Sequence, residues 1–268
     1  MKIKNFYLEL KGKYEKDEDL FKFLKQYITL YSSELFFAEK VIFIEGISEK
    51  ILLPYFIKKF DDDNKGKLGY IPITSQNITY VEAGANAKAF QHLLNFFEVK
   101  SLILTDIDSV ELKEEDGEIT YPACCVRDGV STSNATIKHY LKYNVDDKEW
   151  FNLIKKRSID VDGENINIFY QTEENGYHAR SFEDSFISIN YQVIKEYKDK
   201  ISGLKNRKKI NDKPEDFYGL TNSIIKSKSE FASSLLFLAL VNGDRDDEKR
   251  VVWNTPRYIQ EALEWISQ

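Results

Sequence analysis

The chain has 268 residues, of which 42% are hydrophobic and 31% are charged, so it can bury a sizeable core. This composition excludes a disordered or fibrous protein, and the length predicts one large domain or two small ones. The formal net charge of -6 excludes a uniformly basic nucleic-acid-binding surface. Any contact with nucleic acid must therefore be local.

The two cysteines, Cys124 and Cys125, are adjacent in the sequence. Adjacent cysteines offer neither a disulfide framework nor the spacing of a structural zinc site, which fits a reducing, cytoplasmic compartment. No stretch approaches the roughly 20 apolar residues that cross a bilayer, and the start of the chain lacks the apolar core of a signal peptide. We expect a soluble, unsecreted protein without membrane contact.

Strand and helix patterns alternate along most of the chain. Apolar residues recur at helical spacing from Leu20 to Phe37, and a continuous apolar run at residues 41–44 predicts the first strand. Further strands are predicted at residues 78–81, 101–105 and 166–170, with helices at 48–60, 86–97, 183–197, 231–241 and 257–266. This alternation predicts an α/β fold, a parallel sheet flanked by helices.

The remaining segments suggest a division into three regions. Residues 1–40 would form a linking or association helix region, and residues 41–200 would form the α/β domain. Residues 201–268 would form a C-terminal helical region that completes the functional site of that domain. An insertion at about 109–165 contains a predicted turn at 114–117 and a helix starting near Asn134. Residues 205–213 are polar enough to be a loop or a disordered linker.

Acidic residues follow two of the predicted strands. Glu45 closes the first strand, and Asp106 and Asp108 close the third. In an extended backbone the two aspartates would point the same way, about 6–7 Å apart. Because functional groups gather beyond the carboxyl ends of parallel strands, we expect the three carboxylates to share one edge of the sheet.

Three carboxylates at such close range repel one another, and a divalent cation would remove that conflict. Oxygen ligands without a nearby histidine or thiolate favour Mg²⁺ or Mn²⁺ over zinc. Glu49, in the first turn of the next helix, could turn back toward the same metal, although the helix dipole also favours an acid there without any metal. Asp106 and Asp108 could likewise be a solvated strand end, since aspartate is common in turns.

The segments Val41–Glu49 and Thr105–Asp108 resemble the Glu and DxD motifs of Toprim domains, which occur in topoisomerases, primases and OLD-family nucleases. Three further segments are similar to the OLD (overcoming lysogenization defect) family of ATP-dependent endonucleases: Glu34–Lys40, Ser181–Asp184 and Lys228–Ala232. Together the similar segments cover most of residues 30 to 240. The resemblance implies a Toprim-like sheet with a helical extension at the nuclease portion of such an enzyme.

The resemblance also implies roles for individual residues. Glu45, Glu49, Asp106, Asp108 and either Glu183 or Asp184 would hold two Mg²⁺ or Mn²⁺ ions, and Lys228 would stabilise charge at the scissile phosphate. Two cations roughly 4 Å apart can activate a water molecule and stabilise the leaving oxygen of a phosphodiester. From spacing alone, Lys228 is better explained as a surface lysine before a helix, and only the motif context reverses that preference.

The chain departs from full-length family members in one respect. Those members place an ATPase with a Gly-rich phosphate loop ahead of the Toprim region, and no G-x-x-x-x-G-K-[ST] motif occurs in this sequence. We therefore assign no ATP site. The chain could be one part of a longer protein, a partner of a separate ATPase, or a stand-alone nuclease. In each case it could also form a homo-oligomer.

Two basic clusters could contact a nucleic-acid backbone: Lys155, Lys156 and Arg157, and Arg207, Lys208 and Lys209. A solvated charged face explains each of them as well. We interpret the three histidines, His92, His139 and His178, as structural. No G-x-S-x-G elbow occurs, and none of the 16 tyrosines stands in a context that marks a nucleophile.

The sequence therefore predicts a metal-dependent endonuclease that hydrolyses DNA phosphodiester bonds. The resemblance implies that it is a module of an antiviral defence or phage-interference nuclease. The competing hypothesis is a non-catalytic Toprim module that binds metal or nucleic acid and acts as a regulatory partner of an ATPase.

Overall fold

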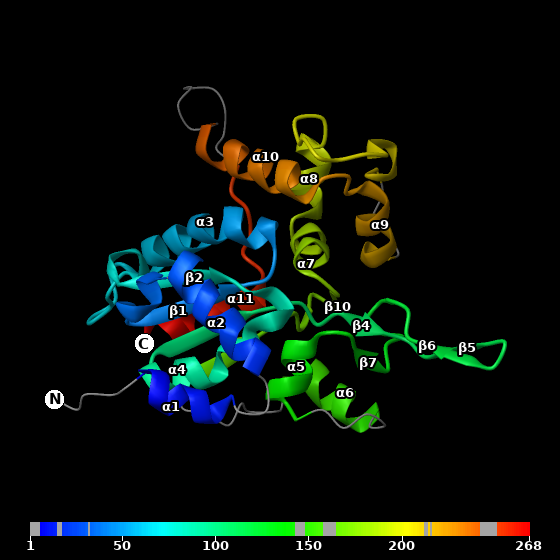
Figure 1. The fold of residues 1–268 in the computed structure, drawn as a ribbon. Helices are drawn as coiled ribbons and strands as arrows, with labels where there is room; N and C mark the ends of the chain where they lie inside the picture. Colours follow the sequence, from blue (N-terminus) through cyan, green and yellow to red (C-terminus); the bar gives the residue numbers. More distant parts are fainter. Residues whose placement is uncertain are drawn as a thin grey trace.

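The framework of the protein is a four-stranded parallel sheet. The computed structural model describes residues 6–14, 18–31, 33–142, 148–157, 165–211, 214, 216–241 and 251–268 (Figure 1). The strands are β1 (Lys40–Ile44), β2 (Ile78–Glu82), β3 (Lys100–Leu104) and β8 (Ile166–Phe169). They lie in the order β2-β1-β3-β8, and every neighbouring pair is parallel, so their carboxyl ends meet at one edge. The predicted α/β fold is confirmed.

Helices cover both faces of the sheet, so its central strands are apolar on both sides. Ile42 and Ile44 of β1 belong to one buried core, whereas Val41 and Phe43, which point the opposite way, belong to the other. This two-sided burial explains why β1 is a continuous apolar run rather than an alternating one.

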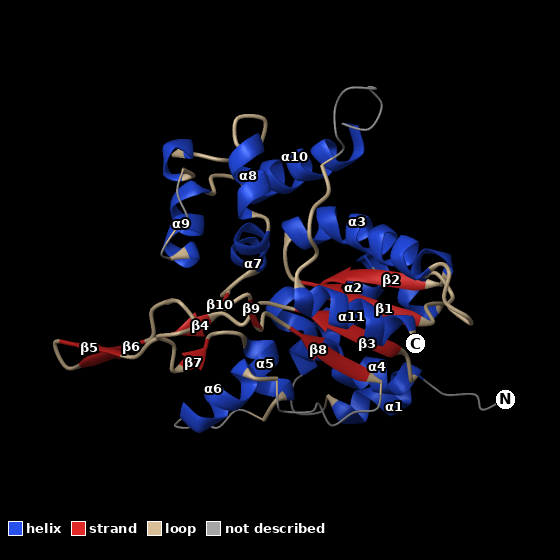
Figure 2. Ribbon diagram, turned by 180° about the vertical axis from the view of Figure 1, so that it is seen from behind, coloured by secondary structure: helices blue, strands red, loops and turns tan. Residues whose placement is uncertain are grey.

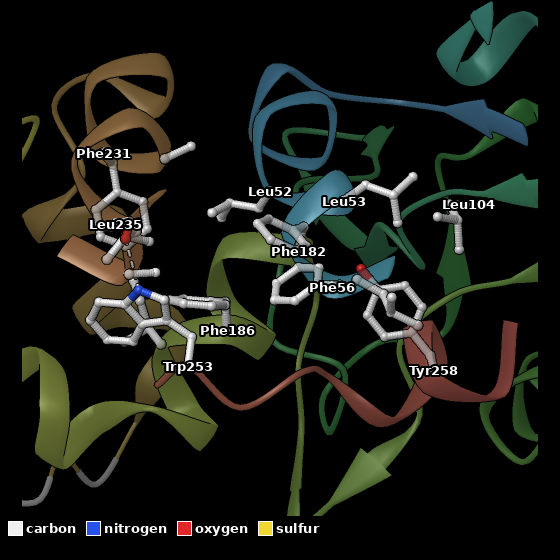
Figure 3. Packing of buried hydrophobic residues seen from close by; sticks show 14 of the residues in the cluster. Leu52, Leu53, Phe56, Leu104, Phe182, Phe186, Phe231, Leu235, Trp253 and Tyr258 are labelled. Carbon is white, nitrogen blue, oxygen red and sulfur yellow. Dashed lines mark hydrogen bonds between the residues drawn. The ribbon is translucent and has the colours of Figure 1, made fainter. Parts of the chain in front are cut away.

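The first core lies between the sheet and the helices that carry much of the predicted site. The elements are α3 (Ile47–Asn64), α7 (Phe182–Ile189), α8 (Tyr191–Tyr197), α9 (Phe217–Ile224), α10 (Lys228–Val241) and α11 (Arg257–Ser267). Large side chains such as Phe56, Phe182, Phe186 and Trp253 interlock there (Figure 3). Trp253 also donates a hydrogen bond from Nε1 to the Leu235 carbonyl at 2.8 Å.

Helix α11 lies directly against the sheet (Figure 2). Lys40 and Lys100, at the beginnings of β1 and β3, donate hydrogen bonds to the carbonyls of Ile266 and Trp265, both at 2.6 Å. These bonds satisfy carbonyls of the last turn, where a cation is also favoured by the helix dipole. The two lysines lie at the amino edge of the sheet and bind the last turn of α11. The first turn of α11, which contains Tyr258, therefore lies toward the carboxyl edge.

The second core lies on the opposite face. It is covered by α1 (Phe6–Lys13), α2 (Glu18–Tyr31), the 3₁₀ segment η3 (Gly84–Phe90), α4 (Gln91–Phe97), α5 (Ala135–Tyr140) and α6 (Lys148–Lys155). Asn134 caps α5 by accepting hydrogen bonds from the backbone N–H groups of Thr136 and Ile137, which agrees with the predicted helix start.

Short strands between β3 and α7 form the rim around the carboxyl edge. They are β4 (Ser109–Val110), β5 (Lys113–Glu115), β6 (Glu118–Thr120), β7 (Ser131–Thr132), β9 (Glu173–Glu174) and β10 (Tyr177–His178). The β5–β6 hairpin projects away from the rest of the protein (Figures 1 and 2). Within the predicted insertion, residues 143–147 and 158–164 lie outside the described residues.

Three predicted helices differ from the structure. The helix predicted at 20–37 ends at Tyr31 and is followed by the 3₁₀ segment η1 (Ser33–Phe36), and the one at 86–97 becomes α-helical only at Gln91. The helix at 183–197 is interrupted at Asn190. The side chain of Asn190 bonds both to the Phe186 carbonyl and to the backbone of Asn254, and its backbone leaves the helical region with φ of -110°.

The polar segment predicted as a loop or linker is anchored over its described part. Within this segment lies the 3₁₀ segment η4 (Arg207–Lys209), and a further one, η2 (Ile73–Ser75), precedes β2. Arg207 donates to the carbonyls of Lys198 and Ile201 at 3.0 and 2.9 Å, and Ile210 is fully buried. Residues 212 and 213 lie outside the described residues. Across the described ranges, no helix is long and apolar enough to span a membrane.

Candidate metal centre

Glu45 joins the ends of the two central strands. Its Oε2 accepts hydrogen bonds from the backbone N–H of Asp106 at 3.1 Å, from Asn134 Nδ2 at 3.4 Å and from the Thr105 hydroxyl. Asn134 Nδ2 also donates to the carbonyl of Asp106 at 2.9 Å. The loop after β3 is thereby fixed against the carboxylate that follows β1.

Glu49 lies in the first turn of α3 with its carboxylate folded back over Gly46. A Cβ atom at Gly46 would lie only 2.6 Å from Glu49 Oε2, so the absence of a side chain there makes this conformation possible. Burial, followed by repulsion from Glu183 and Glu45, raises the pKa of Glu49 to about 8. The side chain therefore faces other acids and not bulk water.

Asp106 is buried between β3 and α7. Its Oδ1 accepts hydrogen bonds from Gln171 Nε2 at 2.7 Å and from the backbone N–H of Phe182 at 2.9 Å. Burial, then repulsion from Glu49 and Glu45, raises its pKa well above the usual range for an aspartate. Its carboxylate and that of Glu49 thus belong to one crowded group.

The sequence spacing predicted an extended backbone from Asp106 to Asp108. The structure contradicts this prediction. Strand β3 ends at Leu104, and Asp108 has a left-handed backbone with φ of 45°. Its Oδ1 forms an ion pair with Arg180 Nη1 at 2.8 Å, and its N–H donates to the Arg180 carbonyl at 3.3 Å. Burial raises the pKa of Asp108, and the neighbouring guanidinium opposes part of that shift.

The adjacent acids at the start of α7 face different surroundings. Glu183 accepts a hydrogen bond from the Ser48 hydroxyl at 2.7 Å and pairs with Lys228 Nζ at 2.9 Å. Asp184 accepts from the Tyr177 hydroxyl and from the backbone N–H of Arg180, each at 2.8 Å. Burial raises the pKa of Asp184 to about 6. Glu183 belongs to the crowded group, whereas Asp184 turns toward the β9–β10 hairpin.

Lys228 is the first residue of α10, where the helix dipole disfavours a cation. Its side chain remains 54% exposed, while that of its partner Glu183 is only 4% exposed. Burial by itself would lower the pKa of Lys228, but attraction to Glu183, Asp106 and Glu49 outweighs this effect and raises it. The ammonium therefore lies at the boundary between the buried acids and solvent.

Two buried residues near the acids carry no recognisable sequence signal. Gln171 uses both ends of its amide: Oε1 accepts from the backbone N–H of Ile107 at 2.8 Å, and Nε2 donates to Asp106. Burial raises the pKa of Tyr258 of α11, and the nearby charges of Glu49 and Asp106 raise it further, so this tyrosine lies close to Gln171 and the acids. Arg180, which is partly buried and pairs with Asp108, also carries no sequence signal.

The donor set suits a hard divalent cation. Glu45, Glu49, Asp106, Asp108 and Glu183 supply carboxylate oxygens, which Mg²⁺ and Mn²⁺ prefer. Across the part of the chain that the structure describes, protein donors contact Oδ1 of Asp106 and Oε2 of Glu45, and none contacts the other oxygen of either carboxylate. Glu45 and Asp106 are therefore each held by one oxygen, and the second oxygen of each is left for a ligand.

The acids are not already converged on a single point. Among the described residues, no group of three or more His, Cys, Asp or Glu side chains is arranged as it stands to hold a metal ion. Cation binding would therefore require side-chain rotation. For Glu183 this rotation would replace its contacts with Ser48 and the half-exposed Lys228, which hold its two oxygens.

The two predicted basic clusters lie apart from these acids and differ internally. Arg157 pairs with Glu261 at 2.9 Å and lies 3.9 Å from the centre of the Phe169 ring, so it is occupied in packing, as is Arg207. The lysines of the two clusters are more available: Lys156, Lys208 and Lys209 are exposed, and Lys155 is partly so.

The three histidines have structural contacts. His92 packs edge-on against Tyr14 at 5.1 Å between ring centres, and a ring nitrogen of His139 lies 2.7 Å from Gln91 Oε1. His178 Nε2 lies 2.9 Å from the carbonyl of Gln171. None of these contacts brings an imidazole among the acids.

Comparison with known proteins points to one family. Residues 36–108 match the model of the family described as "Overcoming lysogenization defect protein-like, TOPRIM domain". This range contains Glu45, Glu49, Asp106 and Asp108. Over 271 residues the chain is 31% identical to a protein of Bacillus cereus (strain HuB5-5) named "Endonuclease GajA". That match covers 96% of this chain and 35% of the relative, so the chain spans about a third of the relative's length.

Proposed function

We propose that the chain, whose residues 36–108 match the OLD-like Toprim domain, is a nuclease module that hydrolyses DNA phosphodiester bonds with Mg²⁺ or Mn²⁺. The observation that carries the proposal is the buried group of acids at the carboxyl edge of the sheet, with one lysine at its solvent boundary. Such crowding is unfavourable without a cation and suits two-cation phosphodiester chemistry.

We assign Glu45, Glu49, Asp106, Asp108 and Glu183 as the ligands of two cations. The contacts of Asp184 with Tyr177 and with the Arg180 backbone support Glu183 in preference to its neighbour. When bound, the cations would supply an activated water and charge neutralisation at the leaving oxygen.

The protein side chains would orient and complement that chemistry. Gln171 and the Phe182 N–H fix one oxygen of Asp106, which keeps its orientation from varying between turnovers. Lys228 can exchange its contact with Glu183 for one with a phosphate oxygen, where negative charge grows in the transition state. Its half-exposed position supports access to substrate.

A plasmid-nicking assay tests the proposal. Wild-type protein should nick supercoiled DNA in Mg²⁺ or Mn²⁺ and lose this activity in EDTA. Asp106→Ala should lose it in every buffer while keeping the far-ultraviolet circular dichroism of the wild type. Asp62→Ala, which removes an exposed carboxylate from the distal part of α3, is the matched control and should cleave normally.

Two outcomes would overturn the nuclease assignment. Cleavage that persists in EDTA or in Asp106→Ala would show that the acids are not its source. Wild-type protein that binds DNA but cleaves it with neither metal would instead support a non-catalytic module that regulates an ATPase.

We further propose that the chain works within a larger assembly. The matched endonuclease extends well beyond the region of similarity, which supports an ATPase region either joined to this module or supplied by a separate subunit. Leu30 and Phe37 are 70% and 78% exposed, which supports residues 1–40 as an association surface for such a partner or for a second copy. The division at residues 40 and 200, a cytoplasmic location and a role in antiviral defence rest on the family resemblance and the sequence.

A further inference from the structure

A polar cleft of about 1460 Å³ lies on the other side of the β9–β10 hairpin from the acids. Its walls come from the end of α6, the hairpin, the start of α11 and the loop around Arg127. Pockets for small molecules usually measure roughly 300–1,000 Å³ and are mostly apolar. This cleft is larger, and charged and polar side chains dominate its lining.

Positive charge exceeds negative charge in the cleft, although the whole chain has a net charge of -6. Five arginines and lysines line it, against three acids. Glu261 pairs with Arg157, and Asp216 caps α9 by accepting from two backbone N–H groups. Arg127 pairs at 3.2 Å with Asp128, which does not line the cleft, and its side chain remains 86% exposed.

Among the described residues, no carboxylate forms an ion pair with Lys155 or Lys156. Burial, then repulsion from Lys148 and Lys156, lowers the pKa of Lys155. An anion in the cleft would relieve this repulsion.

The cleft shares a wall with the candidate metal centre. Thr172 lines the cleft and directly follows Gln171, whose amide holds Asp106. Tyr177 also lines the cleft and donates a hydrogen bond to Asp184, the residue next to Glu183. A chain of phosphates crossing the hairpin would therefore pass from the cations of the cleft to the acids of the centre.

The aromatic rings of the cleft are not available for stacking with bases. Among the described lining residues the rings are those of Phe169 and Tyr177, with the imidazole of His178. Arg157 covers the face of Phe169 at 3.9 Å, and Tyr177 packs against Phe217 at 5.1 Å between ring centres. Recognition through base stacking is thus disfavoured relative to recognition of phosphates.

We propose that this cleft binds the sugar-phosphate backbone of the DNA substrate beside the scissile phosphate, through Lys155, Lys156, Arg127 and Arg257. The inference rests on the proposed nuclease function and adds to it the path of the strand. It makes binding independent of sequence and steeply dependent on salt. The proposal also assigns DNA binding to only one of the two basic clusters. Arg207, Lys208 and Lys209 do not line the cleft.

The test is equilibrium binding of a short fluorescent DNA duplex in EDTA, so that cleavage does not interfere. Affinity is measured between about 50 and 200 mM KCl for wild type, Lys155→Ala/Lys156→Ala, Lys208→Ala/Lys209→Ala and Lys65→Ala/Lys67→Ala. The last variant removes two exposed lysines from just beyond α3, at the end far from the acids, and is the charge-matched control. Lys155→Arg/Lys156→Arg tests whether charge is sufficient, and thermal melting verifies folding.

The cleft variant should bind on the order of 10-fold or more weakly near 0.1 M salt, and the slope of log affinity against log salt should become shallower by about 1.8 for two lost phosphate contacts. The arginine variant should retain affinity, and the control should match wild type. Wild-type binding without salt dependence, or a cleft variant that behaves like the control, overturns the proposal, as does an equal or greater loss in Lys208→Ala/Lys209→Ala.

Two further outcomes separate this proposal from others. If inorganic triphosphate stabilises wild type but not the cleft variant, and DNA affinity is the same in both, the cleft serves a small phosphorylated ligand instead. If wild type binds DNA as described but never cleaves it with metal, the nuclease proposal fails while the cleft stands. If wild type cleaves and the cleft variant binds normally, only the cleft proposal fails.

Discussion

The candidate metal centre and the basic cleft lie on two sides of the same hairpin, yet they are built in opposite ways. In the centre, most acids are buried and held by defined hydrogen bonds, such as those from Gln171 and Phe182 to Asp106. In the cleft, Lys155 and Lys156 are partly or fully exposed on a helix end. Chemistry requires groups fixed to within a fraction of an ångström, whereas attraction of a polyanion requires only charge density.

This difference predicts how the two sites respond to mutation. Changes in the centre should alter the rate of the chemical step or the affinity for metal, with large effects from single side chains. Changes in the cleft should alter DNA affinity in a salt-dependent manner and should be graded by charge. The predictions below test that contrast, beginning with the largest expected effect.

Lys228→Ala should lower the single-turnover cleavage rate at saturating DNA by about 10²–10³-fold, the range seen when one electrostatic stabiliser is removed. Lys228→Arg should recover part of the loss, because a planar guanidinium differs from a compact ammonium. Lys226→Ala, an exposed lysine two residues earlier, is the control. An unchanged rate with weaker, salt-dependent binding would move Lys228 from the chemistry to the backbone contacts.

The pair Glu183→Gln and Asp184→Asn compares adjacent residues with different surroundings. Glu183→Gln should reduce cleavage on the order of 10²-fold or more, because it removes charge from the crowded group and the partner of Lys228. Asp184→Asn should change the rate only a few-fold, since its carboxylate contacts Tyr177 and the Arg180 backbone. Rates measured side by side in Mg²⁺ decide the matter, and a reversed order would reassign the ligand.

Gln171→Leu should weaken metal binding by about 10–100-fold, as loss of a residue that orients a ligand commonly does. Isothermal titration with Mn²⁺ measures this directly, without reference to activity. Gln260 lies in the same helix as Tyr258, and its side chain donates a hydrogen bond to the Thr255 carbonyl. Gln260→Leu is therefore the control for a general loss of stability. Equal Mn²⁺ affinities for wild type and Gln171→Leu would reduce Gln171 to a packing role.

Metal should stabilise the folded protein. At about 100 times its dissociation constant, a cation that binds only the folded state adds about 2.7 kcal/mol, which corresponds to a rise in Tm of about 5–10 °C for a protein of this size. Mn²⁺ should act at lower concentration than Mg²⁺. The rise should be absent in Asp106→Ala, and no shift in wild type at millimolar metal would contradict a cation site.

The sequence predicted the parts of the site that depend on local order. Continuous apolar runs located β1 and β3, and acids placed directly after them were expected at the carboxyl edge of a parallel sheet. Glu45 and Asp106 follow from this reasoning because a strand and its end are adjacent along the chain. The left-handed backbone of Asp108 does not follow from it, because its conformation depends on Arg180, far along the sequence.

The supporting residues could not be predicted for the same reason. Gln171 contacts Asp106 across 65 positions, and an isolated glutamine after a strand has no characteristic pattern. Tyr258 is one tyrosine among 16, and only the packing of α11 on the sheet brings it to the acids. The break at Asn190 likewise depends on Asn254, whose proximity is a property of the fold. Sequence patterns report neighbours in the chain, and these contacts are between distant segments.

The packing of α11 has a consequence for the order of events during synthesis. Lys40 and Lys100 hold the end of this helix, and its first turn places Tyr258 against Gln171. A nascent chain that has left the ribosome only as far as α10 lacks the helix that packs on β3 and β8, and it lacks this contact. The acids are therefore all synthesised before Tyr258, and the residues that support them are complete only after residue 258 has emerged.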